Sequence, residues 1–163
     1  MIEPVEVTTT VAVEPTEAFR IFTEEIDAWW LDGPRHRPDP DRLGVLELQL
    51  EPGGELAENY PEGEPARFVL GRVRSFRRPR GMNAGVLHLE LGGRDFVPGE
   101  WTWVSVLFEA CDEGTRVRVT QGGFDTLAPG HPAFHGLEGV ALSSLYGLWW
   151  ADLIAALRRR AGD

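Results

Sequence analysis

The chain has 163 residues, of which 42% are hydrophobic and 26% charged, and this length and composition favour one globular domain spanning residues 1–163. Six tryptophans and eight phenylalanines exclude a disordered chain, because so much apolar surface is not left in water. The net charge of −10 repels phosphate backbones and anionic lipids, so we expect neither a nucleic acid nor a membrane as partner.

Targeting signals and cysteine usage narrow the class of protein further. The longest uncharged apolar runs fall far short of the ~18 residues that a membrane span needs. The first residues lack the basic and apolar segments of a signal peptide, so we expect none. The single cysteine, Cys111, excludes an internal disulfide and a cysteine-based zinc site, which fits a cytoplasmic protein.

The first predicted elements are a strand and a helix. In residues 5–13, valines alternate with glutamate and threonine, a pattern typical of a half-buried strand. Pro15 suits the first turn of a helix, and the apolar residues that follow recur at spacings of three and four. We therefore predict a helix over residues 15–28, which ends before a proline-rich loop at residues 33–40.

Six further runs are predicted to be strands. Apolar and polar residues alternate in most of them, and the turns between them include Pro52-Gly53-Gly54 and Asp112-Glu113-Gly114. Strands joined by short turns pair antiparallel. The predicted strands cover residues 46–50, 55–59, 68–74, 87–91, 101–110 and 115–120.

The last segment changes to a helical period. From about residue 131 to residue 160 the apolar residues form one wide stripe, and Arg158-Arg159-Arg160 suit the negative end of the helix dipole. At ~1.5 Å per residue such a helix is ~40 Å long and crosses a small sheet. We predict an α+β helix-grip fold, in which a curved antiparallel sheet of six to seven strands wraps around the long C-terminal helix. A cavity is expected where the sheet curls away from the helix.

Several motifs follow one another in an order that is found in a known family. They are the opening strand with Glu14-Pro15 and Trp29-Trp30, the Pro52-Gly53-Gly54 turn, Gly71-Arg72-Val73 before Pro79, the stretch from Pro98-Gly99-Glu100 to Gly114-Thr115, and the aromatic helix around Trp149-Trp150. In this order and spacing the chain resembles the START-like (SRPBCC, Bet v 1-like) superfamily, most of all its activator of Hsp90 ATPase homologue 1-like group.

The resemblance implies a helix-grip fold and often an internal hydrophobic pocket, but no single activity. The superfamily includes lipid carriers, hormone receptors, polyketide cyclases and co-chaperone domains, and a fold alone is weak evidence for function. The chain has Gln121 where many relatives have a histidine, and residues 80–84 lack a tryptophan that relatives often carry. The identity of a ligand is therefore not implied.

We interpret the chain as a binding protein for a small hydrophobic or amphipathic molecule, held in a cavity between the sheet and the C-terminal helix. Aromatic rings with a few polar groups are typical of such sites, although aromatic residues also fill protein cores. The predicted ligand-binding residues are Trp29, Trp30, His36, Phe68, Trp101, Trp103, Gln121, Phe124, Tyr146, Trp149 and Trp150.

Two alternative functions come from the resemblance. An aromatase/cyclase-type enzyme needs an acid–base group such as His36 or His88 inside the cavity, and a chaperone-linked adaptor would act through its surface. The sequence holds no nucleophile elbow, phosphate loop or dinucleotide motif, so we predict no catalytic residue and no cofactor, and we favour binding over catalysis. A homodimer formed through a sheet edge or a helix stays open.

Three other groups of residues have a chemical interpretation beside a structural one. His131 and His135 are four apart on the predicted helix and, with Glu138, could bind zinc, but the spacing alone is unspecific and we predict no metal. Cys111 is a poor nucleophile, because its acidic neighbours suppress the thiolate. A basic cluster is either neutralised by nearby glutamates or docks an acidic protein, and it consists of Arg72, Arg74, Arg77, Arg78 and Arg80.

Overall fold

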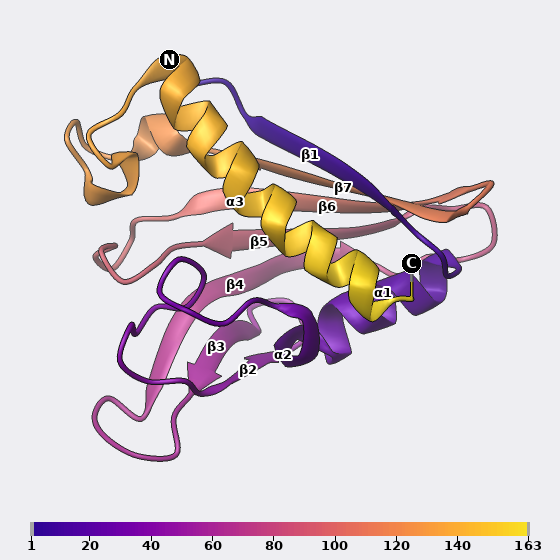
Figure 1. Cartoon of the computed structure of the whole chain (residues 1–163), viewed down its shortest axis with the longest axis horizontal. Helices are drawn as coiled ribbons and strands as arrows, with labels where there is room; N and C mark the ends of the chain where they lie inside the picture. The colour runs from indigo at the N-terminus through magenta and orange to yellow at the C-terminus, as the bar shows by residue number, and fades with distance from the viewer. Residues whose placement is uncertain (1, 163) are drawn as a thin grey trace.

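The computed structural model describes residues 2–162 and shows a seven-stranded antiparallel sheet with a long helix across it (Figure 1). The strands lie in the order β1-β7-β6-β5-β4-β3-β2. Their bounds are β1 Val5–Val11, β2 Val45–Leu48, β3 Glu55–Asn59, β4 Arg67–Arg77, β5 Gly85–Leu91, β6 Thr102–Cys111 and β7 Gly114–Gly122. The predicted helix-grip fold is confirmed, and the ends of the predicted strands differ from these by at most three residues.

Side chains alternate between the two faces of the central strands, which gives the sheet one apolar face. Val104, Val106 and Phe108 of β6 pair with Gln121, Val119 and Val117 of β7, and all six are buried on the inner face. Trp103, the residue before Val104, points the other way and is 41% exposed. Successive side chains of a strand point to opposite faces, which separates the buried residues from the exposed ones. Gln121 is a polar residue that this alternation places among apolar residues on the inner face.

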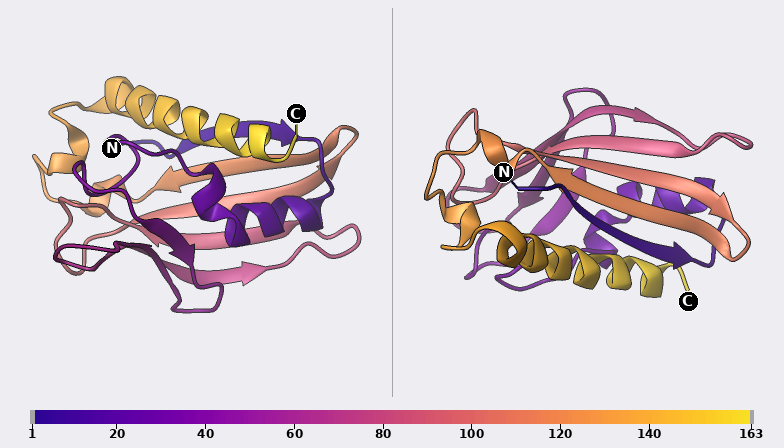
Figure 2. Two further views of the ribbon diagram at one scale, coloured as in Figure 1. Left: turned by 60° about the horizontal axis from the view of Figure 1, so that its bottom comes forward. Right: turned by 90° about the horizontal axis from the view of Figure 1, so that it is seen from above.

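Two irregularities bend the sheet. The register shifts between Leu56 and Ala57, where β3 pairs with β4, and between Val73 and Ser75, where β4 pairs with β5. A β-bulge places two residues opposite one and increases the local twist. The sheet therefore curls around the helix, as the two further views show (Figure 2).

The concave face of the sheet is covered by α3, Gly139–Arg160. Its inward side chains are buried, among them Leu142, Trp150, Leu153, Ile154 and Leu157. The helix crosses the sheet from the loop after β7 to the region of α1 (Figure 1). The predicted stripe of apolar residues therefore does face the sheet over much of its length.

The predicted start of this helix, near residue 131, is wrong. Residues 131–138 form a loop that contains the short 3-10 helix η2, Pro132–Phe134, and α3 begins only at Gly139. Gly136 and Gly139 have φ values of 71° and 57°, a left-handed conformation that interrupts a right-handed helix. At ~1.5 Å per residue, α3 is about 33 Å long rather than ~40 Å.

The predicted helix over residues 15–28 is also divided. It consists of α1, Pro15–Glu24, and α2, Ile26–Trp29, with a break at Glu25. The carboxylate of Glu25 lies 2.6 Å from Arg20 and 2.8 Å from Arg160, at the end of α3. After the break, the indole Nε1 of Trp29 donates to the carbonyl of Phe22 at 3.1 Å, so the second segment folds back on the first.

By length and composition, α3 could span a membrane. An 18-residue window within it has a mean hydropathy of 1.5, and a third of that window is buried. Its longest uncharged run, residues 139–151, is nevertheless shorter than the ~18 residues of a membrane span, as expected from the sequence. In the structure, however, the helix packs against the sheet as the core helix of the fold. Packing against the sheet does not explain why the outward side of the helix is also apolar, with Val140 and Leu148 exposed.

Candidate functional site

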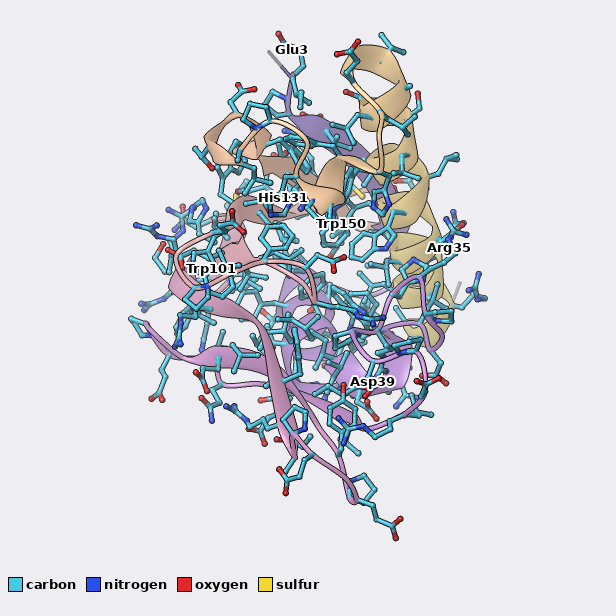
Figure 3. The ribbon with its side chains drawn as sticks, turned by 90° about the vertical axis from the view of Figure 1, so that its left-hand side faces the viewer. Glu3, Arg35, Asp39, Trp101, His131 and Trp150 are labelled. Atoms are coloured by element: carbon cyan, nitrogen blue, oxygen red, sulfur yellow. The ribbon has the colours of Figure 1, made fainter. Side chains whose placement is uncertain are left out.

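A pocket of about 450 Å³ lies under the first half of α3. Its walls come from four places: the loop after α2, the loop between β5 and β6, the η2 loop, and α3 itself. Figure 3 looks onto this end of the molecule, with Arg35 on one side, His131 near the middle and Trp101 at the opposite margin. The apolar part of the lining includes Leu70, Leu91, Phe96, Leu145, Tyr146 and Trp149.

The floor of the pocket carries a chain of hydrogen bonds on buried side chains. The indole Nε1 of Trp150 donates to Oε1 of Gln121 at 2.8 Å, and Nε2 of Gln121 donates to Oγ1 of Thr102 at 2.9 Å. The Thr102 hydroxyl in turn donates to the carbonyl of Leu91 at 2.7 Å. Gln121 and Thr102 both line the pocket and are almost fully buried. They are the polar groups that a molecule in the pocket would meet deepest.

Tyr146 closes the pocket on the side of the η2 loop. Its hydroxyl donates to the carbonyl of Ala133 at 2.8 Å, and its ring packs against Phe124 with centroids 4.8 Å apart. Burial raises the pKa of Tyr146 to about 12, so the hydroxyl is neutral at physiological pH. The hydrogen bond ties the η2 loop to α3 at the pocket wall.

His36 and Trp149 form the opposite wall. Their rings stack with centroids 5.1 Å apart, and Nε2 of His36 lies 3.3 Å from the carbonyl oxygen of Trp149. The indole of Trp149 donates to the carbonyl of Arg35 at 2.5 Å, and that of Trp30 donates to the carbonyl of His36 at 2.8 Å. Burial lowers the pKa of His36 below its usual 6.5, so the imidazole is neutral at pH 7.

The loop that carries His36 is held by a buried ion pair. Nη1 of Arg37 lies 2.9 Å from Oε2 of Glu58 on β3, and their side chains are 2% and 0% exposed. The same carboxylate accepts from the hydroxyl of Tyr60 at 2.6 Å and from the backbone N–H of Gly44 at 3.0 Å. Arg37 also donates to the carbonyl of Trp30 at 3.1 Å. Arg37 lines the pocket, but its guanidinium is engaged with the protein.

This ion pair was not predicted from the sequence. The signal that could have found it is the charge of Glu58 inside a strand whose neighbours, Leu56 and Ala57, are fully buried. A buried carboxylate requires a partner. The partner, Arg37, lies 21 residues away in a loop, and no local pattern connects the two.

The structure distributes the eleven predicted ligand-binding residues over three places. His36, Gln121, Tyr146 and Trp149 line the pocket. Trp29, Trp30, Phe124 and Trp150 are buried in the hydrophobic interior, and the half-buried Phe68 packs against it. The indole of Trp30 contacts those of Trp29 and Trp150. Trp103 lies on the outer face of the sheet, and Trp101 packs beside Gly92 without lining the pocket.

The predicted histidine pair does not share a helix face, because both residues lie before α3 begins. Nε2 of His131 lies 2.9 Å from Oε1 of Glu100, and Nδ1 accepts from the backbone N–H of Ala133 at 3.0 Å. His135 has a φ of 52° and lines the pocket. Within residues 2–162, no three potential metal ligands of the His, Cys, Asp and Glu types come together.

Part of the basic cluster on β4 is neutralised within the sheet. Arg72 lies 3.0 Å from a carboxylate oxygen of Glu55, and Arg74 lies 2.8 Å from one of Glu90. Arg78 lies over the rings of Phe19 and Phe76, 5.8 Å from each centroid. Two of the five arginines of the cluster therefore have carboxylate partners on neighbouring strands.

The fold and the pocket define a helix-grip protein with the START-like (Bet v 1-like) fold. No family model matches the chain, and no curated protein matches its sequence. Solved structures do match: the chain is similar to protein NE0264 of Nitrosomonas europaea, with 17% identity, a TM-score of 0.63, and coverage of 97% of this chain and 93% of that one.

Two further solved structures are also similar to the chain. PFC0360w, an HSP90 activator from Plasmodium falciparum, is 17% identical with a TM-score of 0.56, covering 98% of this chain and 96% of that one. Ara h 8.0201 is 14% identical with a TM-score of 0.55, covering 99% and 98%. At these identities the likeness shows the fold, which agrees with the resemblance seen in the sequence.

Proposed function

We propose that the chain binds a small hydrophobic or amphipathic molecule in the pocket under the first half of α3. The observation that carries the proposal is the contrast within one interior. The indoles of Trp29, Trp30 and Trp150 pack against one another or a neighbouring ring, while about 450 Å³ beside them is left unfilled. An apolar pocket with a few convergent polar groups is the usual form of a small-molecule site.

The lining suits an amphipathic ligand in particular. Leu70, Leu91 and Leu145 offer apolar contact, and burial of ~200 Å² of apolar ligand surface gives ~5 kcal/mol at ~25 cal/mol per Å². Association itself costs several kcal/mol, so apolar contact alone gives affinities no tighter than the millimolar range. The polar floor at Gln121 and the polar groups at the mouth then fix the orientation of the ligand.

A cyclase-type reaction has less support than binding. Of the two histidines considered as acid–base groups, His36 lines the pocket and His88 is exposed on β5. The Nε2 of His36 is next to the Trp149 carbonyl, so its proton is directed into the helix backbone rather than towards a substrate. We therefore propose a carrier or sensor of a small molecule, acting in the cytoplasm.

A chaperone-linked adaptor is the second candidate, because one solved relative in fold is an HSP90 activator. Such a role would use the surface and leave the pocket idle. Co-purification with Hsp90, with no effect of pocket substitutions, would favour the adaptor over the carrier.

The carrier proposal is tested by titrating the protein with 1-anilinonaphthalene-8-sulfonate while following tryptophan emission. Leu145→Asp places a charge on the pocket wall, and we expect it to weaken binding at least about tenfold, since a buried unpaired charge is costly. Leu43→Asp is the matched control, because Leu43 is 58% exposed and away from the pocket. Binding that is equal in all three proteins, or absent from the unsubstituted protein, contradicts the proposal.

A further inference from the structure

The direction of every hydrogen bond on the pocket floor is fixed by one indole. The Nε1 of Trp150 can only donate, so the atom of the Gln121 amide that faces it is the oxygen. The nitrogen therefore faces Thr102, and the Thr102 hydroxyl, having accepted from it, donates to the carbonyl of Leu91. The amide cannot be turned around without placing two donors against each other.

This arrangement leaves one N–H donor of the Gln121 amide without a partner among the described residues. The amide nitrogen of Gln121 carries two N–H groups, and only the one towards Thr102 has a partner among the described residues. Gln121 is 3% exposed and lines the pocket, so the second N–H is desolvated beside empty space. An unpaired buried donor is unfavourable, and a ligand atom that accepts from it gains what the protein leaves unmade.

Two other polar groups of the pocket wall, Tyr146 and His36, do not offer a donor to a ligand. The hydroxyl of Tyr146 gives its proton to the carbonyl of Ala133, so towards a ligand it can only accept. The neutral His36 directs its Nε2 proton to the carbonyl of Trp149, which leaves its Nδ1 as an acceptor. Of these three groups, only Gln121 has a donor left for a ligand, namely its second N–H.

We propose that the ligand enters with a carbonyl or equivalent acceptor oxygen first, which accepts the second N–H of Gln121, while its apolar body lies against the leucines and Trp149. The inference rests on the proposed function, because it names the chemistry of the molecule that the pocket takes. The ligand class is an aryl or alkyl ketone, ester or quinone rather than a pure hydrocarbon or an amine.

The test compares 2-acetylnaphthalene with 2-ethylnaphthalene, which differ in the carbonyl alone. The measured quantity is the ratio of their affinities, taken by competition with the anilinonaphthalene probe. In Gln121→Met and Gln121→Glu we expect this ratio to move against the ketone by about three- to tenfold, the worth of one neutral hydrogen bond. Gln121→Glu keeps an acceptor for the indole of Trp150, so this variant serves as the test in case Gln121→Met does not fold.

Tyr146→Phe is the control within the same pocket. It removes a hydroxyl whose proton is already committed to Ala133, so the ratio should not change. If both naphthalenes bind and the ratio is the same in all four proteins, the inference is overturned and the carrier proposal stands. If neither naphthalene nor the probe binds the unsubstituted protein, both are overturned.

A second inference concerns the outward side of α3, which the fold does not cover. Val140 and Leu148 are 83% and 65% exposed, and Asp152 is the one charged residue between Gly139 and Leu157. In the view from above, α3 lies at the margin of the molecule with this side free (Figure 2). Exposed apolar surface of this kind marks an interaction site.

The outward side of α3 can pack against the same side of a second copy that runs antiparallel to it, with Leu148 at the centre. Two antiparallel copies related by a twofold axis at Leu148 bring Ala141 opposite Ala155, so that small residues allow close helix packing. The same register brings Glu138 to the end of the partner helix that carries Arg158 and Arg159. Within residues 2–162 none of these three charged side chains has an ion-pair partner in its own chain.

We infer that a second copy of this chain covers the outward side of α3, as an antiparallel helix pair centred on Leu148. Opposite charges meet at both ends of such a pair, which fixes the antiparallel direction and the register. The partner is a second copy rather than another protein, because the charge pattern of the helix matches its own reverse.

Sedimentation velocity over the micromolar range tests this arrangement. The unsubstituted chain should dimerise, Leu148→Glu should be monomeric because it sets two carboxylates against each other, and Leu43→Glu, on another surface, should dimerise normally. In a Cys111→Ser background, Leu148→Cys should form an intermolecular disulfide and Ala155→Cys should not. A monomeric parent protein, or a dimer unaffected by Leu148→Glu, overturns the inference.

Discussion

Removal of the Arg37 guanidinium should destabilise the fold more than any single surface change. Arg37→Ala leaves the fully buried carboxylate of Glu58 with the hydroxyl of Tyr60 and the N–H of Gly44 but without a cation. Breaking one partner out of a buried pair costs about 3–5 kcal/mol in the free energy of unfolding. For a chain of this size that corresponds to a fall of about 6–20 °C in Tm.

The assay is urea denaturation followed by tryptophan fluorescence, with the double variant Arg37→Met/Glu58→Leu included. The double variant removes both charges, so we expect it to be more stable than Arg37→Ala by about 2 kcal/mol or more. Arg74→Ala is the control: its pair with Glu90 is on the surface, with Arg74 63% exposed, and should cost at most about 1 kcal/mol. Equal losses for Arg37→Ala and Arg74→Ala would show that the buried pair contributes no more to stability than the surface pair.

Three other predictions follow from burial. Because the pKa of His36 is lowered in the fold, its contribution to the free energy of unfolding is complete above pH 6.5 and decreases as pH falls below that value. His36→Gln should abolish this decrease in denaturation curves taken across that range. Burial raises the pKa of Tyr60 and of Tyr146, the two tyrosines of the chain, so tyrosinate absorbance should not appear near the ordinary pKa of about 10 until the protein is unfolded. Phe108→Ala should cost about 3–5 kcal/mol, because its buried ring contacts two phenylalanines of α1 edge-on, and a loss below about 1 kcal/mol would contradict the packing described.

The sheet could be predicted from the sequence because its signal is local. Alternation in residues 5–13 and 115–120 and the turn at Gly114 fix the strands and their antiparallel connections without knowledge of distant residues. The start of α3 could not be placed, because the apolar stripe continues through residues 131–138. Pro132 in this segment, and Gly136 and Gly139 with their positive φ values, override the pattern.

The site was predictable only in part. Gln121, Tyr146 and Trp149 line the pocket, but composition does not tell which aromatic rings pack together and which border open space. The outward direction of Trp103 could have been predicted, because successive side chains of a strand point to opposite faces and the neighbouring Val104 faces inwards with Val106. A long-range pair such as Arg37 and Glu58 has no local signature at all.

The most direct test of the account follows the six tryptophan indoles, each of which gives one N–H resonance, during titration with 2-acetylnaphthalene. A ligand in the pocket should shift the indole signals of Trp149, which lines it, and of Trp150, which donates to Gln121 on its floor. The signals of Trp29 and Trp103 should stay in place, because neither residue lines the pocket. Shifts confined to Trp103, or no saturable shift of Trp149, would show that the ligand does not bind in this pocket.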